Sequence, residues 1–428
     1  MSKKLMPSFH ILIICLVMVL TTTAVTAKAK ITVFYHGAAG LWEYNDLIDA
    51  TQRFMDLNPD IEVELIRGAS GWQEYIPQVL LHIASGSDID IITPQPHWGG
   101  FISLLDSVAD LSPYMEKDGL KPSDFLAGSI DAYNYNGKIT GLPIAVVLRG
   151  HVYNKRMLDE AGFVPPAIDE WTWDTVIEVG RKLTIRRSGE AIPSIAGVDV
   201  GGDVRPLIFF PLATQAGGMF FDRFINPTQS LINTAPVRTA LQYFMSFYQN
   251  GYSFTNRRFY NKQAAYSMDA PLVTLDYIEQ RLGHTDIQFI PAAKGPVKGG
   301  FQIGVQGLQM LSSSKNPEAA WRYISYMATS LEEVRIKYSK TQREPSAYLK
   351  ALPLFFNLAD QVPCFEAWLA IANHPDNTPR YSLKSAEIET YLTDILTSVM
   401  KGEKALNAAI EEMHTAVQVM LDESHKIK

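Results

Sequence analysis

Strands and helices alternate in the first hundred residues, and this alternation limits the chain to a small set of folds. Short β-branched runs separate longer segments whose apolar residues recur with helical spacing. The predicted order is strand 31–35, helix 42–57, strand 61–65, helix 72–84 and strand 89–93. Connections of this kind are right-handed and build a parallel sheet that helices cover. We therefore predict an α/β fold.

Residues 136–163 predict a passage from this first sheet into a second one. Asn136 and Gly137 favour a tight hairpin turn, because both central residues of that turn need a positive φ. Residues 144–148 form a continuous apolar run that suits a strand buried on both faces. Arg149 and Gly150 end this strand in mid-chain. We interpret the segment as a crossing between two halves of the molecule.

The same segment carries a set of short motifs. They are Gly-Leu-Pro at 141–143, Val-Tyr-Asn-Lys at 152–155 and Leu-x-x-Ala-Gly at 158–162. Phe-Met-Asp-Leu-Asn-Pro-Asp-Ile-Glu-Val at 54–63 and Ala-Ser-Gly-Ser-Asp-Ile-Asp-Ile-Ile at 84–92 precede them. In this order the motifs resemble those of the extracellular solute-binding proteins of ABC importers, in the sugar-binding group related to maltose-binding protein. The resemblance covers nearly the whole chain after residue 27.

This resemblance implies a two-lobe, periplasmic-binding-protein-like fold, with a mostly parallel sheet flanked by helices in each lobe and several hinge crossings. It implies an N-terminal lobe of residues 28–142 and 270–328 and a C-terminal lobe of residues 143–269 and 329–428. Such proteins capture a small-molecule carbohydrate between the lobes and deliver it to the transmembrane subunits of an ABC permease. We expect a monomer, without a cofactor.

Residues 1–27 have the layout of a secretory signal peptide. Lys3 and Lys4 precede the apolar segment 9–20, and small residues ending at Ala27 follow it. The apolar segment is shorter than the ~20 residues that a membrane span needs. Cys15 lies inside it, without the small residues that precede a lipidated cysteine. We predict cleavage near Ala27 and an unlipidated periplasmic protein.

The charge and the cysteines exclude several classes of function. The formal charge is −7, and removal of Lys3 and Lys4 with the signal peptide makes it −9. Nucleic acid is therefore not an expected partner, because phosphate binding needs a basic surface. Cys364 remains as a single cysteine, so no internal disulfide can form. The nine histidines are scattered without metal-ligand spacing, and we expect no metal.

Two loops are candidates for ligand contact, because ligands bind beyond the carboxyl ends of parallel strands. The loop after strand 31–35 carries Ala39, Trp42 and Glu43, and the loop after strand 89–93 carries Gln95, His97 and Trp98. Prolines and glycines around Trp98 favour a ring presented at the loop. Trp42 fits packing on its own helix about as well. An apolar ring face with a wet edge suits a sugar.

The resemblance adds positions from both lobes. In the second lobe it points to Arg149, Gln215, Gly217, Asp269, Arg380 and Tyr381, and in the first lobe to Val305 and Gln306. The family often has Trp shortly after the position of Pro271, where this chain has Leu272. A stacking ring typical of maltodextrin sites is therefore missing from the sequence.

Arg149 and Arg380 leave the charge of the ligand open. An Arg at the end of a strand is commonly solvated. A guanidinium can also grip vicinal hydroxyls or a carboxylate. If both arginines face the cleft, an acidic sugar or a sugar phosphate becomes a candidate ligand.

The sequence has no recognised catalytic motif, neither a nucleophile elbow nor a phosphate loop. Carboxylate pairs such as Glu43 and Asp46 fit a solvated helix face better than a glycosidase dyad. The predicted function is that of an exported protein, not an enzyme, that captures a mono- or oligosaccharide for an ABC permease. The alternatives are a binding protein for a sugar acid, a glycerol phosphate diester or another polar solute, and an exported carbohydrate-active enzyme.

Overall fold

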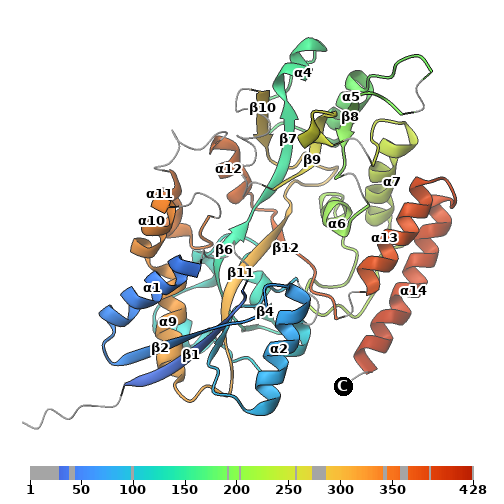
Figure 1. The fold of residues 1–428 in the computed structure, drawn as a ribbon. Helices are drawn as coiled ribbons and strands as arrows, with labels where there is room; N and C mark the ends of the chain where they lie inside the picture. Colours follow the sequence, from blue (N-terminus) through green and yellow to red (C-terminus); the bar gives the residue numbers. More distant parts are fainter. Residues whose placement is uncertain are drawn as a thin grey trace, which may run out of the picture.

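The computed structural model describes residues 28–37, 44–97, 101–189, 192–201, 204–255, 258–271, 286–340, 345–356, 365–384 and 387–426. The expected signal peptide, Ala39, Trp42, Glu43, Trp98, Leu272 and Cys364 lie outside these residues. The described chain folds into two lobes, each with its own sheet and helices (Figure 1). The two-lobe α/β fold is thus confirmed.

The first lobe is built on a sheet of six strands among the described residues, in the order β12-β11-β3-β1-β2, with β6 paired to β11. The strands are β1 (Ala29–Tyr35), β2 (Ile61–Arg67), β3 (Ile91–Ile92), β6 (Leu142–Val147), β11 (Gln302–Met310) and β12 (Thr378–Pro379). As the alternation predicted, β1 pairs in parallel with β2 and β3.

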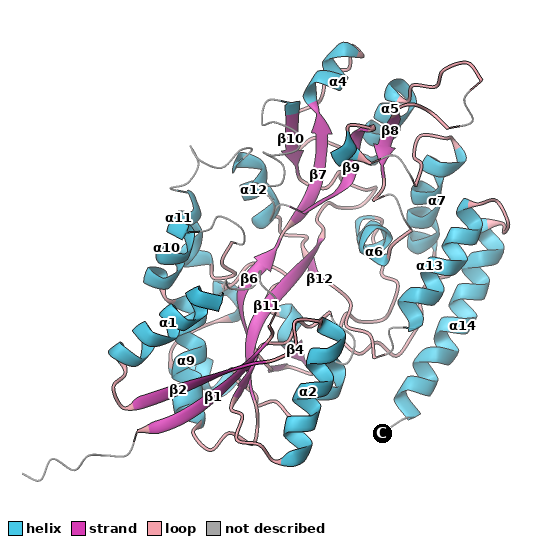
Figure 2. Ribbon diagram, in the orientation of Figure 1, coloured by secondary structure: helices cyan, strands magenta, loops and turns pink. Residues whose placement is uncertain are grey.

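Helices cover both faces of this first sheet (Figure 2). The helices of this lobe include α1 (Tyr44–Leu57), α2 (Trp72–Ser85), α3 (Ser112–Lys117), α9 (Pro317–Thr329), α10 (Leu331–Lys340) and α11 (Leu352–Phe356). Neighbouring residues of a strand point to opposite faces. Val33 accordingly packs in one core cluster with Phe54 of α1 and Ile324 of α9, whereas Phe34 packs in another with Ile76 of α2.

The second lobe has a sheet in the order β10-β7-β9-β8. Its strands are β7 (Arg149–Asn154), β8 (Ala196–Asp199), β9 (Ala264–Pro271) and β10 (Ile287–Ile290). Its helices include α4 (Lys155–Glu160), α5 (Trp173–Leu183), α6 (Pro206–Gln215), α7 (Ala235–Gln249), α12 (Phe365–Ala372), α13 (Glu387–Met400) and α14 (Leu406–Lys426).

The passage between the lobes takes place at Leu148, where β6 of the first sheet runs directly into β7 of the second (Figure 1). The expected hairpin precedes it: β4 (Asn134–Tyr135) pairs with β5 (Lys138–Ile139), and Asn136 and Gly137 have φ values of 53° and 80°. The chain returns from β10 into β11. Because these neighbouring crossings run in opposite directions, β6 and β11 are antiparallel.

The same geometry corrects the expected strand directions in the second lobe. We expected a mostly parallel sheet, but β7 is antiparallel to both β9 and β10, and only β8 and β9 are parallel. The reason is the hinge itself. Outgoing β7 lies between two strands that lead back toward the first lobe.

The expected lobe boundaries also differ from the structure. We placed residues 143–147 in the second lobe, but they lie in β6 of the first sheet. We placed residues 287–290 in the first lobe, but β10 pairs with β7 of the second. We placed α10 and α11 in the second lobe, yet Glu333 of α10 is paired with Arg53 of α1, and α11 lies beside α10 (Figure 1). Each segment follows the apolar surface that it covers rather than its place in the sequence.

None of the helices in the described part of the chain combines the length and the hydropathy needed to cross a bilayer. The described residues likewise contain no cluster of three or more His, Cys, Asp or Glu side chains that could hold a metal ion.

Candidate functional site

Arg149 lies between the two lobes, directly after the crossing at Leu148. We call this region, where the ends of β7, β9 and β12 meet, the waist. Arg149 is the first residue of β7, and its backbone lies opposite Pro271 at the end of β9. Asp269 of β9 is close enough for its Oδ1 to accept a hydrogen bond from Nη1 of Arg149 in a buried ion pair. The side chains of Arg149 and Asp269 are 17% and 7% exposed. Two residues that the resemblance selected are therefore joined directly.

A second arginine, which the sequence analysis missed, bonds the same carboxylate. Nη2 of Arg205 lies 3.1 Å from Oδ2 of Asp269. Arg205 is the N-cap residue of α6, and Pro206 follows it at the first helical position. That Arg-Pro pair at a helix start was the available signal, because Pro favours the first turn and fixes what precedes it.

Arg380 approaches from a third segment, directly after β12. Its Nη1 donates a hydrogen bond to Nε2 of His97 over 3.2 Å. The guanidinium lies beside Gly304 on β11, where a Cβ atom would be at contact distance, 3.5 Å, from Cζ of Arg380. Burial, together with the charge of Arg149, lowers the pKa of Arg380 to about 9.

His97 belongs to the loop that follows β3, so its bond to Arg380 joins two distant parts of the chain. Burial, and after it the charges of Arg380 and Arg149, hold the pKa of His97 well below its ordinary value. The imidazole is therefore neutral near pH 7, and its Nε2 can accept the hydrogen bond that Arg380 donates. Nearby, Ser382 Oγ donates a hydrogen bond to the carbonyl of Pro96.

Gln95, Val305 and Gln306 are buried in the first lobe. Gln95 lies two residues before His97. Val305 and Gln306 follow Gly304 on β11, where they are paired with Val146 and Ala145 of β6.

Three other expected contacts are engaged within the second lobe. Gln215 is fully buried, and its amide accepts from Trp173 Nε1 and donates to the carbonyl of Gly300, both at 2.8 Å. The hydroxyl of Tyr381 accepts from the backbone N–H of Phe220 at 3.1 Å. Gly217 has a φ of 87°, a left-handed turn that glycine favours. In this structure Gln215 and Tyr381 serve packing, and Gly217 serves a turn.

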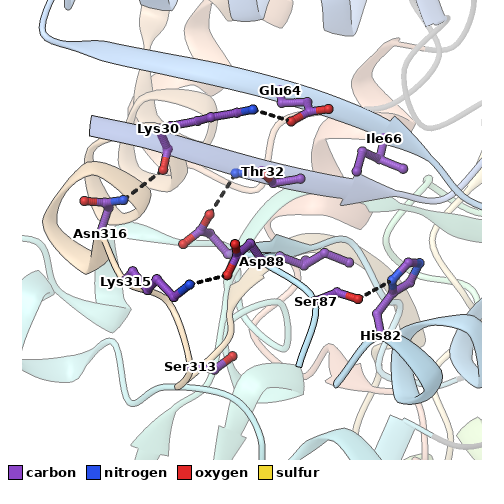
Figure 3. Close-up of a pocket in the computed structure, with 12 residues that line it drawn as sticks. Lys30, Thr32, Glu64, Ile66, His82, Ser87, Asp88, Ser313, Lys315 and Asn316 are labelled. Carbon is purple, nitrogen blue, oxygen red and sulfur yellow. Dashed lines mark hydrogen bonds and ion pairs between the residues drawn. The ribbon is translucent and has the colours of Figure 1, made fainter. Parts of the chain in front are cut away.

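A cavity of about 560 Å³ lies elsewhere, on the first lobe (Figure 3). Side chains of β1, β2, the end of α2 and the segment before α9 line it. Its charged groups are paired with one another: Lys30 with Glu64 at 2.8 Å and Lys315 with Asp88 at 2.5 Å. It contains none of the residues that the sequence selected, and we do not assign the ligand to it.

Residues 43–330 match a family model, that of the bacterial extracellular solute-binding proteins. This chain belongs to that family. The match begins next to the first candidate loop and runs through both crossings at Leu148 and before β11.

Two relatives align with part of the chain. An arabinooligosaccharide-binding protein of Halalkalibacterium halodurans is 27% identical over 188 residues, which cover 42% of this chain and 38% of that protein. A lactose-binding protein of Rhizobium radiobacter is 26% identical over 175 residues, which cover 40% of this chain and 36% of that protein. The alignments thus span less than two fifths of either relative.

A solved structure extends the likeness to nearly the whole fold. The sugar-binding protein MalE from Xanthomonas citri superposes with a TM-score of 0.75 at 19% identity, and the match covers 93% of this chain and 99% of MalE. At that identity the likeness establishes the fold. The family and its fold neighbours are substrate-binding proteins rather than enzymes.

Proposed function

We propose that this solute-binding protein captures a carbohydrate between its two lobes and delivers it, chemically unchanged, to the permease of an ABC importer. The observation that carries the proposal is the meeting of His97, Arg149 and Arg380 at the waist, from three separate segments of the chain. The names of the relatives, which bind arabino-oligosaccharides and lactose, support a sugar as the guest.

The mechanism follows from a site divided between lobes. A ligand that contacts both lobes stabilises the arrangement in which they are closed around it, and it shifts the equilibrium by its preference for that arrangement. Buried polar groups at the waist would select the hydroxyl pattern, since an unmatched buried donor or acceptor costs about 1–3 kcal/mol. The permease would then recognise the closed surface.

A thermal-shift screen over mono- and oligosaccharides, followed by isothermal titration calorimetry, tests the proposal. We expect at least one sugar to raise the melting temperature and to bind with one site per chain. Chromatography of the sugar after incubation should recover it intact. Turnover of a glycoside by the purified protein would favour the carbohydrate-active enzyme instead, and failure of every sugar to bind folded protein would overturn the proposal.

Trp98 gives the proposal a second test from the sequence. A ring presented between prolines and glycines would stack on a sugar face, so Trp98→Ala should lose most of the affinity while the protein stays folded. Trp98→Phe keeps a ring and serves as the matched control. Unchanged affinity in Trp98→Ala would assign the ring to packing.

Export and assembly state complete the proposal. Removal of residues 1–27 would release a periplasmic protein that begins at Lys28. Amino-terminal sequencing of the exported protein should therefore start there, and light scattering should give the mass of a monomer. A chain that still begins at Met1, or a stable dimer, would contradict these two points.

A further inference from the structure

Both oxygens of the carboxylate at the centre of the waist already accept a hydrogen bond from an arginine. Asp269 accepts from Arg149 through Oδ1 and from Arg205 through Oδ2. A single negative charge therefore faces two guanidinium groups, and one positive charge is left over from this group of three side chains.

Arg380 adds a third guanidinium to the same place. Its hydrogen-bond partner, His97, is neutral and brings no negative charge. Glu389 of α13 acts on Arg380 electrostatically, and burial raises the pKa of its own carboxyl group. Three arginines thus share the waist with the two acids Asp269 and Glu389.

The remaining charges near Asp269 balance each other and do not remove this excess. Asp199 accepts from the backbone N–H groups of Gly201 and Phe259. Arg258 donates to the carbonyl of Gly201 and acts on Asp199 as an opposite charge. This second pair therefore leaves the surplus at Arg149, Arg205 and Arg380 in place.

Each of the three arginines also has a hydrogen-bond donor, its Nε–H group, that no described residue accepts. In each of them the Nε atom is shielded from water and makes no hydrogen bond within the described part of the chain. A carboxylate or a phosphate offers several acceptor lone pairs and a negative charge at once, and guanidinium groups bind both in planar, charge-assisted hydrogen bonds. A neutral hydroxyl could accept one donor but could not offset the charge.

We propose that the waist of this protein takes an anionic sugar, whose carboxylate or phosphate group lies against Arg149, Arg205 and Arg380. This inference rests on the proposed function, because it names the class of carbohydrate that the same site would hold. The ring and its hydroxyls would face the loop after β3, and the anionic group would face the ends of β7, β9 and β12.

Sugars that differ only at C6 separate the charge from the rest of the ligand. Calorimetry would compare galactose, galacturonate and galactose 6-phosphate, the same three forms of glucose, and the disaccharides of galactose and of galacturonate. For at least one ring type, we expect an acidic form to bind roughly tenfold or more tightly than its neutral counterpart. Added NaCl should weaken the acidic form more than the neutral one. The carboxylate and phosphate arms identify which group the site prefers.

Variants connect the preference to the arginines. Arg380→Gln and Arg149→Gln should each abolish most of the advantage of the acidic sugar. Arg181→Gln removes the same charge from an exposed position on α5, where the side chain is 62% exposed, and should leave the preference intact. Circular dichroism checks that each variant is folded. The comparison of ligands on the wild-type protein decides the question even if a variant does not fold.

The outcomes also separate this inference from the proposed function. Tight binding of neutral sugars with no gain from the acidic forms would overturn the anionic ligand and leave carbohydrate capture standing. Binding of neither form by folded protein would overturn both. An acidic preference that survives in Arg380→Gln and Arg149→Gln would show that the arginines are not its source.

Discussion

Arg380 donates a hydrogen bond to His97 across 3.2 Å, and this bond joins the loop after β3 to the point where the chain leaves β12 for the core of the second lobe. Two residues farther on, Ser382 Oγ bonds to the carbonyl of Pro96. The candidate loop of the first lobe is therefore fastened to the last described crossing. A ligand that moves this loop would therefore also shift the position of one lobe relative to the other.

Loss of the fastening at Ser382 should weaken ligand binding without unfolding the protein. In Ser382→Ala the loop loses one hydrogen bond, and a bond of this kind contributes about 1 kcal/mol. We expect the dissociation constant of the best sugar from the screen to rise roughly fivefold. Ser398→Ala, which removes an exposed hydrogen bond from the Ser398 hydroxyl to the carbonyl of Asp394 within α13, is the control. Equal affinity in both variants would show that the loop does not depend on this bond.

Three buried histidines should make the protein less stable as the pH falls below 6.5. Burial lowers the pKa of His36 to about 4 and that of His151 to about 3, and burial with the charges of two arginines holds that of His97 well below its usual value. The folded state keeps these rings neutral, while the unfolded state takes up protons below its pKa of about 6.5. Stability is therefore complete above pH 6.5 and declines toward the folded pKa values.

For His151 alone, the free energy of unfolding at pH 5 is about 2 kcal/mol lower than above pH 6.5. Urea unfolding at pH 7.5 and pH 5 measures the loss, and His151→Gln should reduce it. NMR of the imidazole C–H groups gives the direct check: His97 and His151 should not titrate between pH 5.5 and 8, whereas both should titrate normally in urea. A midpoint near 6.5 for either ring in the folded protein would contradict the assignment.

The ion pair between Arg53 and Glu333 should stabilise the first lobe, because it fastens α10 to α1. Nη2 of Arg53 lies 2.6 Å from Oε2 of Glu333, which is 2% exposed, and Tyr326 donates to the same carboxylate at 2.5 Å. Glu333→Gln would leave Arg53, itself one third exposed, without its counter-charge. We expect a loss of about 2 kcal/mol in unfolding free energy. Glu318→Gln breaks the exposed pair with Lys117 and should change nothing measurable.

Glu333 also shows which parts of the fold the sequence could predict and which it could not. Local signals were reliable: Asn136 and Gly137 form the expected turn, and Thr172 caps α5 by accepting from the backbone N–H of Thr175. Ser330 accepts from the N–H of Glu333, three residues later, which is a local capping pattern. The carboxylate of Glu333, however, bonds to Arg53, 280 residues away. Such a partner has no local signal, and so α10 was assigned to the wrong lobe.

The site shows the same division. Arg149 and Asp269 were selected through the resemblance, and the register of β7 and β9 explains why they meet. Arg205 was missed because its role depends on where α6 begins relative to β9. The sequence left the charge of the site open at Arg149 and Arg380. The chain as a whole is acidic, and only folding brings a third arginine, Arg205, to the same carboxylate.

Gly300 should tolerate no side chain, because it lies where two crossing segments touch. Its φ of 83° is left-handed, and a Cβ atom there would lie 2.4 Å from the backbone oxygen of Asp376. Neither segment can yield alone, since the carbonyl of Gly300 is also bonded to Gln215. We expect Gly300→Ala to cost roughly 2–4 kcal/mol of unfolding free energy and to weaken ligand binding by spreading the hinge.

Gly402→Ala is the control that separates backbone strain from the steric clash expected in Gly300→Ala. Gly402 has a similar φ of 76°, but a Cβ atom there would meet no atom within 4 Å. Gly402→Ala should therefore cost only the strain of the backbone, about 1 kcal/mol, and should leave affinity unchanged. Urea unfolding and calorimetry on both variants provide the comparison. Equal losses would mean that the segments at 300 and 376 can move apart freely, and the hinge would then be looser than their contact implies.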